Sequence, residues 1–164
     1  IQRLVGSEMC IRDSDETNLI LDAACIEIVK SKKFSSLPII TPHEGEAAKL
    51  LEINVEEISN KREYYAQKIS DKFGVITVLK GYETIITDGN KIYICKDGDS
   101  SLAFAGSGDI LAGLIGSFLA QGTKDIDSCL LGVSLHAYSA TNSKLKRGLT
   151  ANELIDLIRK NLNQ

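Results

Sequence analysis

The feature that most constrains this chain is a glycine-rich turn that runs directly into an apolar helical pattern. Residues 105–109 are Ala-Gly-Ser-Gly-Asp, and residues 110–115 continue as Ile-Leu-Ala-Gly-Leu-Ile. Glycine permits a tight turn and a close approach of backbone to a ligand. The free N–H groups and the positive dipole end of a helix form an anion site. The pattern predicts a phosphate site at Gly106, Ser107 and Gly108, with Asp109 as its only titratable group; a plain turn is the alternative.

A second motif follows the apolar run at residues 37–40, which predicts a buried strand. Thr41 and Glu44 have the spacing of a capping box, with Pro42 at the first helical position. His43 is then expected in the first turn of a helix at the carboxyl edge of the sheet, where open α/β sheets bind ligands. The alternative is a surface histidine without a ligand.

A third motif begins with residues 75–79, whose apolar and β-branched side chains predict a central strand. Lys80 and Gly81 end this strand. A lysine at a strand end suits a phosphate as a point charge, and the glycine allows close approach; a solvated lysine before a turn is the alternative. Residues 84–94 predict a hairpin around Asp88-Gly89-Asn90.

The remaining pattern predicts helices that alternate with the strands. Their expected ranges are 22–30, 55–73, 108–121 and 126–140, and Thr150 with Glu153 predicts the cap of a final helix. His136 lies within the apolar pattern of its helix, which favours a hydrogen-bonded core histidine. Alternating strands and helices indicate an α/β fold with a largely parallel sheet.

Composition excludes several classes of protein. The 19 Lys and Arg residues are balanced by 22 Asp and Glu, which gives a formal net charge of −3 and argues against a nucleic-acid partner. No apolar run approaches the ~20 residues of a membrane span. The four cysteines lack the spacing of a metal site, so we expect free thiols and a cytoplasmic location.

The order of the motifs resembles one family. Thr-Pro-His-x-Gly-Glu (41–46), Leu-Lys-Gly-x-x-Thr (79–84), Ala-Gly-Ser-Gly-Asp-Ile-Leu-Ala-Gly (105–113) and Leu-Ala-Gln-Gly (119–122) are similar to the ADP-dependent NAD(P)H-hydrate dehydratases of the ribokinase-like superfamily. The resemblance runs from about Leu19 to the C-terminus. It implies a ribokinase-like three-layer sandwich whose N-terminal part is missing from this chain.

The resemblance also implies an activity and a set of site residues. The activity is the dehydration of hydrated NADH or NADPH with ADP or ATP and Mg²⁺, without a metal site on the protein itself, in an enzyme that is a homo-oligomer when full length. His43 and Asp109 would contact the substrate, and Asp109 would be the catalytic base. The predicted nucleotide-binding residues are Lys80, Gly81, Tyr82, Glu83, Thr84, Gly106, Ser107 and Gly108.

Two alternatives to this activity stay open. A ribokinase-like kinase of a small alcohol, such as hydroxyethylthiazole or hydroxymethylpyrimidine, needs the same glycine turn and acid. An inactive nucleotide-binding fragment is the other alternative. The family's Asp-Ala-Asp-Ala pattern is also reduced here to Asp22-Ala23-Ala24-Cys25, which affects only local polar contacts.

The N-terminal sequence indicates that the first residues of this chain are not encoded by the gene itself. Residues 4–14 match, residue for residue, the translation of a common transposase-based sequencing adapter. We therefore expect residues 1–14 to be adapter read-through, and residues 15–164 to be the C-terminal part of a single ribokinase-like domain. Resequencing the locus without that adapter tests this prediction, and recovery of the same codons would contradict it.

Overall fold

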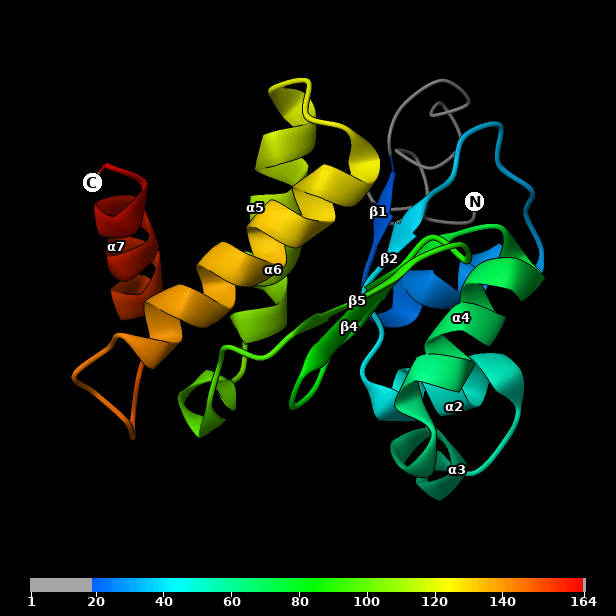
Figure 1. Cartoon of the computed structure of the whole chain (residues 1–164), viewed down its shortest axis with the longest axis horizontal. Coiled ribbons are helices and arrows are strands. Elements are labelled where there is room, and N and C mark those ends of the chain that lie inside the picture. Colours follow the sequence, from blue (N-terminus) through cyan, green and yellow to red (C-terminus); the bar gives the residue numbers. More distant parts are fainter. Residues whose placement is uncertain (1–18, 164) are drawn as a thin grey trace, which may run out of the picture.

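The computed structural model describes residues 19–163, so the predicted adapter at residues 1–14 lies outside the described part of the chain. Five strands form one sheet in the order of the sequence (Figure 1). They are β1 (Ile20–Leu21), β2 (Ile39–Ile40), β3 (Ile76–Leu79), β4 (Thr84–Thr87) and β5 (Ile92–Cys95). The first three strands are parallel, and β4 and β5 continue the sheet antiparallel.

The antiparallel end of the sheet is the hairpin that the sequence predicts. Asp88 Oδ1 accepts the N–H groups of Asn90 (2.9 Å) and Lys91 (3.0 Å), and Gly89 adopts a φ of +91°. These contacts hold the pKa of Asp88 below its usual value, with the Lys91 N–H making the largest contribution. The sheet is therefore parallel where the predicted site lies and antiparallel beyond it.

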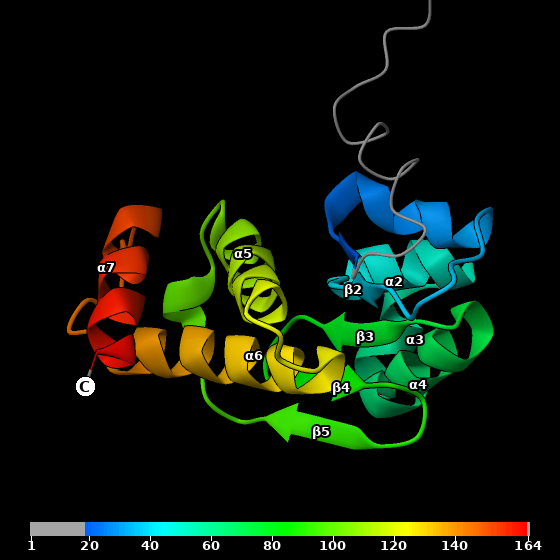
Figure 2. The same ribbon diagram turned by 90° about the horizontal axis from the view of Figure 1, so that it is seen from above.

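Helices cover both faces of the sheet, which gives the predicted α/β three-layer sandwich (Figures 1 and 2). On one face lie the 3-10 helix η1 (Ala23–Lys30), α2 (Glu44–Leu51), α3 (Val55–Asn60) and α4 (Arg62–Phe73). On the other side lie a short 3-10 turn η2 (Ser100–Leu102), α5 (Ser107–Ala120), α6 (Asp125–Thr141) and α7 (Ala151–Leu162).

The alternation of strand side chains explains these layers. Ile40 and Leu79 pack into the cluster beneath η1, α2 and α4, whereas Ile39 and Val78 pack into the cluster beneath α5 and α6. All four side chains are 1% exposed or less. Consecutive residues of a strand face opposite sides, so a strand that is apolar on both faces must be covered by helices twice.

The predicted helix over residues 55–73 is wrong in one respect, because it is two helices. Lys61 adopts φ −144° and ψ 52°, which is not helical, and it separates α3 from α4. The interruption lets α3 bury Ile58 while α4 turns Ala66 and Ile69 toward the sheet. Gly74, at φ +63°, ends α4 as predicted.

The last helix begins as the sequence predicts. Thr150 Oγ1 accepts the N–H of Glu153, whose carboxylate in turn accepts the N–H of Thr150 at 2.9 Å. Leu154 and Ile158 then pack with the end of α6 in a third apolar cluster. Over residues 19–163, no helix combines the length and apolarity that crossing a membrane would require.

Candidate active site

Each of the three parallel strands is followed by a polar residue, and these residues meet at one edge of the sheet. Asp22 follows β1, Thr41 follows β2 and Lys80 follows β3. Asp22 Oδ1 accepts a hydrogen bond from Thr41 Oγ1 at 2.6 Å and from Lys80 Nζ at 2.7 Å. Burial by itself raises the pKa of Asp22, but the hydrogen bonds from Lys80 and Thr41 outweigh it and hold that pKa below its usual value. The carboxylate is therefore ionised and fixes the ammonium group in place.

His43 begins α2, but not in the way the sequence predicts. The predicted capping box of Thr41 and Glu44, with Pro42 at the first helical position, is wrong. His43 is itself the N-cap: its Nδ1 accepts the N–H of Gly45 at 3.0 Å, and Glu46 Oε2 accepts the N–H of His43 at 2.8 Å. The Thr41 hydroxyl instead donates a hydrogen bond to Asp22.

This cap determines the tautomer of His43. A ring nitrogen that accepts a backbone hydrogen bond carries no proton, so the proton of the neutral ring lies on Nε2. The side chain is 59% exposed, and its Nε2 lies 3.5 Å from Glu46 Oε1. The same Glu46 carboxylate lies 3.9 Å from Lys80 Nζ, and it thereby joins the start of α2 to the polar cluster.

The glycine turn forms the start of α5 at the same edge. Gly106, at φ +95°, is the N-cap, and Ser107, Gly108 and Asp109 form the first turn. A Cβ atom at Gly108 would lie 3.2 Å from Lys80 Nζ and 3.6 Å from Asp22 Oδ2. The positive end of the helix dipole therefore lies beside the lysine, which is the arrangement of an anion site.

Asp109 is exposed in the first turn of α5. Its Oδ2 lies 3.9 Å from the position that a Cβ atom of Gly106 would occupy. In the described part of the chain, no hydrogen bond or ion pair joins Asp109 to another predicted site residue. Its carboxylate is thus free to act on a bound molecule.

His136 supports this turn from α6. Its Nε2 lies 3.1 Å from the carbonyl oxygen and 3.3 Å from the hydroxyl of Ser107. The ring is only 7% exposed, and burial lowers the pKa of His136 to about 4. The prediction of a hydrogen-bonded core histidine is confirmed.

The predicted nucleotide segment, Lys80 to Thr84, forms the loop after β3 and ends at Thr84, the first residue of β4. Lys80 donates its N–H to the Pro42 carbonyl at 2.8 Å, and Thr84 Oγ1 donates to the Gly81 carbonyl at 3.2 Å. Gly81 has φ +150° and Glu83 has φ +57°. The side chain of Tyr82 points into solvent, with 79% of the residue exposed. The structure thus brings Lys80 to Gly108 but leaves Tyr82 outside the polar cluster.

Three residues of this region were not predicted from the sequence: Asp22 as the partner of Lys80, Glu46 as the link between them and α2, and Arg62. Asp22 follows a strand at the carboxyl edge, as Lys80 does, so its position in the pattern was a usable signal. Arg62 lay within a charged surface helix and gave no signal. Its guanidinium group reaches the Lys80–Thr84 loop across the fold.

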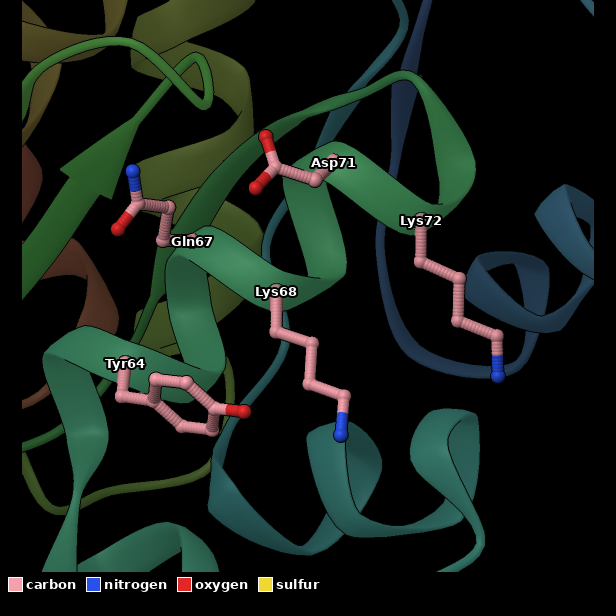
Figure 3. A pocket seen from close by; sticks show the side chains of 5 residues that line it. All are labelled: Tyr64, Gln67, Lys68, Asp71 and Lys72. Atoms are coloured by element: carbon pink, nitrogen blue, oxygen red, sulfur yellow. The ribbon is translucent and has the colours of Figure 1, made fainter.

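A shallow hollow elsewhere on the surface does not belong to this region. Its lining residues all lie on α4, and Figure 3 shows Gln67 and Asp71 on one side of the helix and Lys68 and Lys72 on the other. Gln67 donates to the Gly89 carbonyl at 2.9 Å and so braces the hairpin turn. None of the predicted site residues lines this hollow.

The site also bears on metal binding. Within residues 19–163, no three His, Cys, Asp or Glu side chains gather closely enough to hold a metal ion. The two carboxylates at the centre, Asp22 and Glu46, face the ammonium group of Lys80. A divalent cation at this position would have to displace that lysine.

Comparison with known proteins identifies the relatives of this chain. The family model described as NAD(P)H-hydrate dehydratase matches residues 9–161. A bifunctional NAD(P)H-hydrate repair enzyme of Vibrio cholerae is 37% identical over 139 residues, covering 83% of this chain and 28% of the relative. An ADP-dependent (S)-NAD(P)H-hydrate dehydratase of Neisseria meningitidis is 36% identical over 143 residues, covering 86% and 47%.

A solved structure agrees with the sequence relatives. The ADP/ATP-dependent NAD(P)H-hydrate dehydratase of Bacillus subtilis, co-crystallised with ATP and Mg²⁺ and soaked with CoA, superposes with a TM-score of 0.84 at 29% identity. The match covers 90% of this chain and 56% of the Bacillus protein. The chain thus spans about half or less of the length of these relatives. By its family match, its motifs and its fold, this chain belongs to the NAD(P)H-hydrate dehydratase family.

Proposed function

We propose that the protein to which this chain belongs dehydrates hydrated NADH and NADPH at the expense of an adenine nucleotide. One observation carries the proposal: the glycine-lined start of α5 lies beside the Lys80–Asp22 pair, with the Asp109 carboxylate free in the same turn. This observation supports an anion site next to a candidate base.

The nucleotide phosphates would bind at Gly106, Ser107 and Gly108. The backbone N–H groups of this turn and the ammonium group of Lys80 would stabilise charge on the phosphoryl group as it is transferred. Because Lys80 is held by Asp22, its charge needs little reorganisation when the phosphate arrives. The loop from Gly81 to Thr84 would contact the rest of the nucleotide through its backbone.

Asp109 would act as the general base. It removes the proton from the hydroxyl group of the hydrated nicotinamide ring while that oxygen attacks the terminal phosphorus, whose bond to the nucleotide bridging oxygen breaks. The phosphorylated oxygen then leaves as phosphate, expelled by the lone pair of the ring nitrogen. Loss of a proton from the adjacent ring carbon restores NADH or NADPH. General-base assistance of this kind contributes ~10²–10⁴-fold to a rate.

His43 would contact the substrate through the exposed part of its ring, with Nε2 3.5 Å from Glu46 Oε1. Mg²⁺ would enter bound to the nucleotide phosphates, because the described residues offer it no cage of side chains. It would supply charge neutralisation between the phosphates.

We also propose that the whole protein is cytoplasmic and a homo-oligomer. The thiols of Cys25, Cys95 and Cys129 are free, which suits a reducing compartment. Fractionation of cells and the mass of the full-length protein in solution test these two points.

The decisive experiment supplies hydrated NADH, Mg²⁺ and ADP to the 164-residue chain and, in parallel, to the full-length product of its gene. For the full-length protein we expect recovery of NADH absorbance, with one AMP formed for each NADH. The alternative is a ribokinase-like kinase, which would leave hydrated NADH unchanged and phosphorylate a thiazole or pyrimidine alcohol. That outcome would overturn the proposal.

A further inference from the structure

Arg62 is the side chain that holds the predicted nucleotide loop in shape. Its Nη1 donates to the carbonyl oxygens of Tyr82 and of Glu83, the latter at 3.1 Å. Its Nη2 lies 3.3 Å from the carbonyl oxygens of both Leu79 and Lys80. One planar cation thus gathers four carbonyl groups from five consecutive residues, a fork geometry that lysine cannot reproduce.

The loop needs such a partner because its backbone is strained. Glu83 adopts a left-handed conformation at φ +57°, which costs a side-chain-bearing residue on the order of 1 kcal/mol. At Gly81, with φ +150°, a Cβ atom would lie 2.6 Å from Arg62 Nη2. A side chain at this position would therefore displace the guanidinium group and would also adopt an unfavourable backbone angle.

The direction of these carbonyl groups also orients the amides of the loop. In a trans peptide the N–H of the next residue points opposite to the carbonyl, and the described chain has no cis peptide bond. The N–H groups of Gly81, Glu83 and Thr84 therefore point away from Arg62. The loop thereby presents N–H groups on the side opposite the guanidinium, where an anion can accept hydrogen bonds from them.

Arg62 is in turn fixed to the start of α2. Its Nε lies 3.0 Å from Glu44 Oε1, an ion pair in which the arginine side chain is 15% exposed. The other oxygen of Glu44 accepts a hydrogen bond from Ser59 Oγ at 2.6 Å. Glu44 directly follows His43, so one arginine connects the turn that carries the histidine to the loop that carries Lys80.

We propose that Arg62 is a positioning residue: it fixes residues 79–83 in the conformation that binds the adenine nucleotide and joins that loop to the His43 turn. This rests on the proposed function, because it assumes that the loop binds ADP or ATP. Arg62 would touch neither the nucleotide nor the reacting atoms. Its effect is on the affinity for nucleotide and on the coupling between the two halves of the site.

The test compares the wild type with Arg62→Ala and Arg62→Lys in the full-length protein. The control is Arg159→Ala, which removes an arginine of α7 whose side chain is 78% exposed and which pairs with Asp156 of the same helix. Affinity for ADP is measured by calorimetry, and hydrogen exchange follows the amides of residues 80–84. Arg62→Ala should weaken ADP binding about 10- to 100-fold, the effect of losing charge-assisted hydrogen bonds.

Arg62→Lys separates positioning from bulk stability. It keeps the charge and the pairing with Glu44 but not the fork, so we expect melting close to that of the wild type with ADP binding still weakened and loop exchange still accelerated. KM for ADP should rise more than kcat falls. Unchanged affinity and exchange in Arg62→Ala would overturn the proposal, as would full rescue by lysine.

Gly81→Ala supplies an independent test. In the wild type the added methyl group meets the guanidinium, so the loss of ADP affinity should be larger than in the Arg62→Ala background, where that contact is gone. Equal losses of ADP affinity in the wild-type and Arg62→Ala backgrounds would contradict the proposed contact between Arg62 and the loop at Gly81. A wild-type protein that binds no adenine nucleotide refutes the proposed function itself, a result distinct from normal binding by the Arg62 variants.

Discussion

The two backbone segments that meet at this site are built in opposite ways. The turn at Gly106 to Asp109 takes its shape from the helix that it begins, with one buried histidine behind it. The loop at Lys80 to Thr84 begins no helix, and a side chain from another helix holds its carbonyl groups. The conformation of the first segment depends on local interactions and on the dipole of the helix that it begins. The conformation of the second depends on a contact with a side chain that is distant in the sequence. The binding of a ligand that contacts both segments can therefore be weakened by a change at the glycine turn or by a change at Arg62.

The largest effect is expected at the local turn. Asp109→Asn removes the base but not the N–H groups around it, so turnover of hydrated NADH should fall ~10²–10⁴-fold while ADP still binds. Single-turnover kinetics and calorimetry on the same preparation measure the two quantities. Turnover near that of the wild type would refute the role of Asp109.

Protonation of His136, which lies behind this turn, should destabilise the protein at low pH. The native pKa of His136, about 4, lies below its ordinary value of 6.5, so the unfolded chain binds more protons between these values. The contribution of the neutral His136 to the free energy of unfolding is therefore complete above pH 6.5. It is lost as the pH is lowered toward 4, which reduces the free energy of unfolding by on the order of 3 kcal/mol. Urea unfolding between pH 7 and 4.5 measures this slope. His136→Gln should flatten it.

Lys80 is where the two segments touch, and its removal sharpens the comparison. Lys80→Met should weaken ADP binding about tenfold, the loss of one charge-assisted contact. It should also raise the pKa of Asp22, because the hydrogen bond and charge that oppose burial are lost. In the double variant with Asp22→Asn, thermal stability should recover while ADP affinity does not. Recovery of both would show that the lysine acts only as a partner of Asp22.

The smallest effect is expected at Tyr82. Its side chain is in solvent, and only its carbonyl group takes part in the loop. Tyr82→Ala should therefore change the free energy of unfolding by less than about 0.5 kcal/mol and leave ADP affinity unchanged. A loss of affinity as large as that of Arg62→Ala would mean that the tyrosine ring itself contacts the nucleotide.

Much of the local structure was predictable from short patterns. The hairpin turn, the end of α4 at Gly74 and the cap of α7 at Thr150 follow from turn glycines, Asx geometry and capping spacing. The start of α2 was displaced by two residues because two overlapping capping patterns compete there. Glu46 caps His43, while Glu44 is drawn to Arg62, a partner 18 positions away that no local pattern contains.

The residues of the candidate site also separate into those that local patterns predict and those that distant contacts bring together. The sequence by itself determined the glycine turn, its acid, and the strand ends that carry His43 and Lys80, because these depend on backbone freedom and on interactions within one turn. Only the tertiary structure decided that Lys80 pairs with Asp22 and that Arg62 holds the loop between β3 and β4. Such contacts join residues 17 to 58 positions apart, and the layered packing of the sheet and helices, not any local preference, brings them within reach.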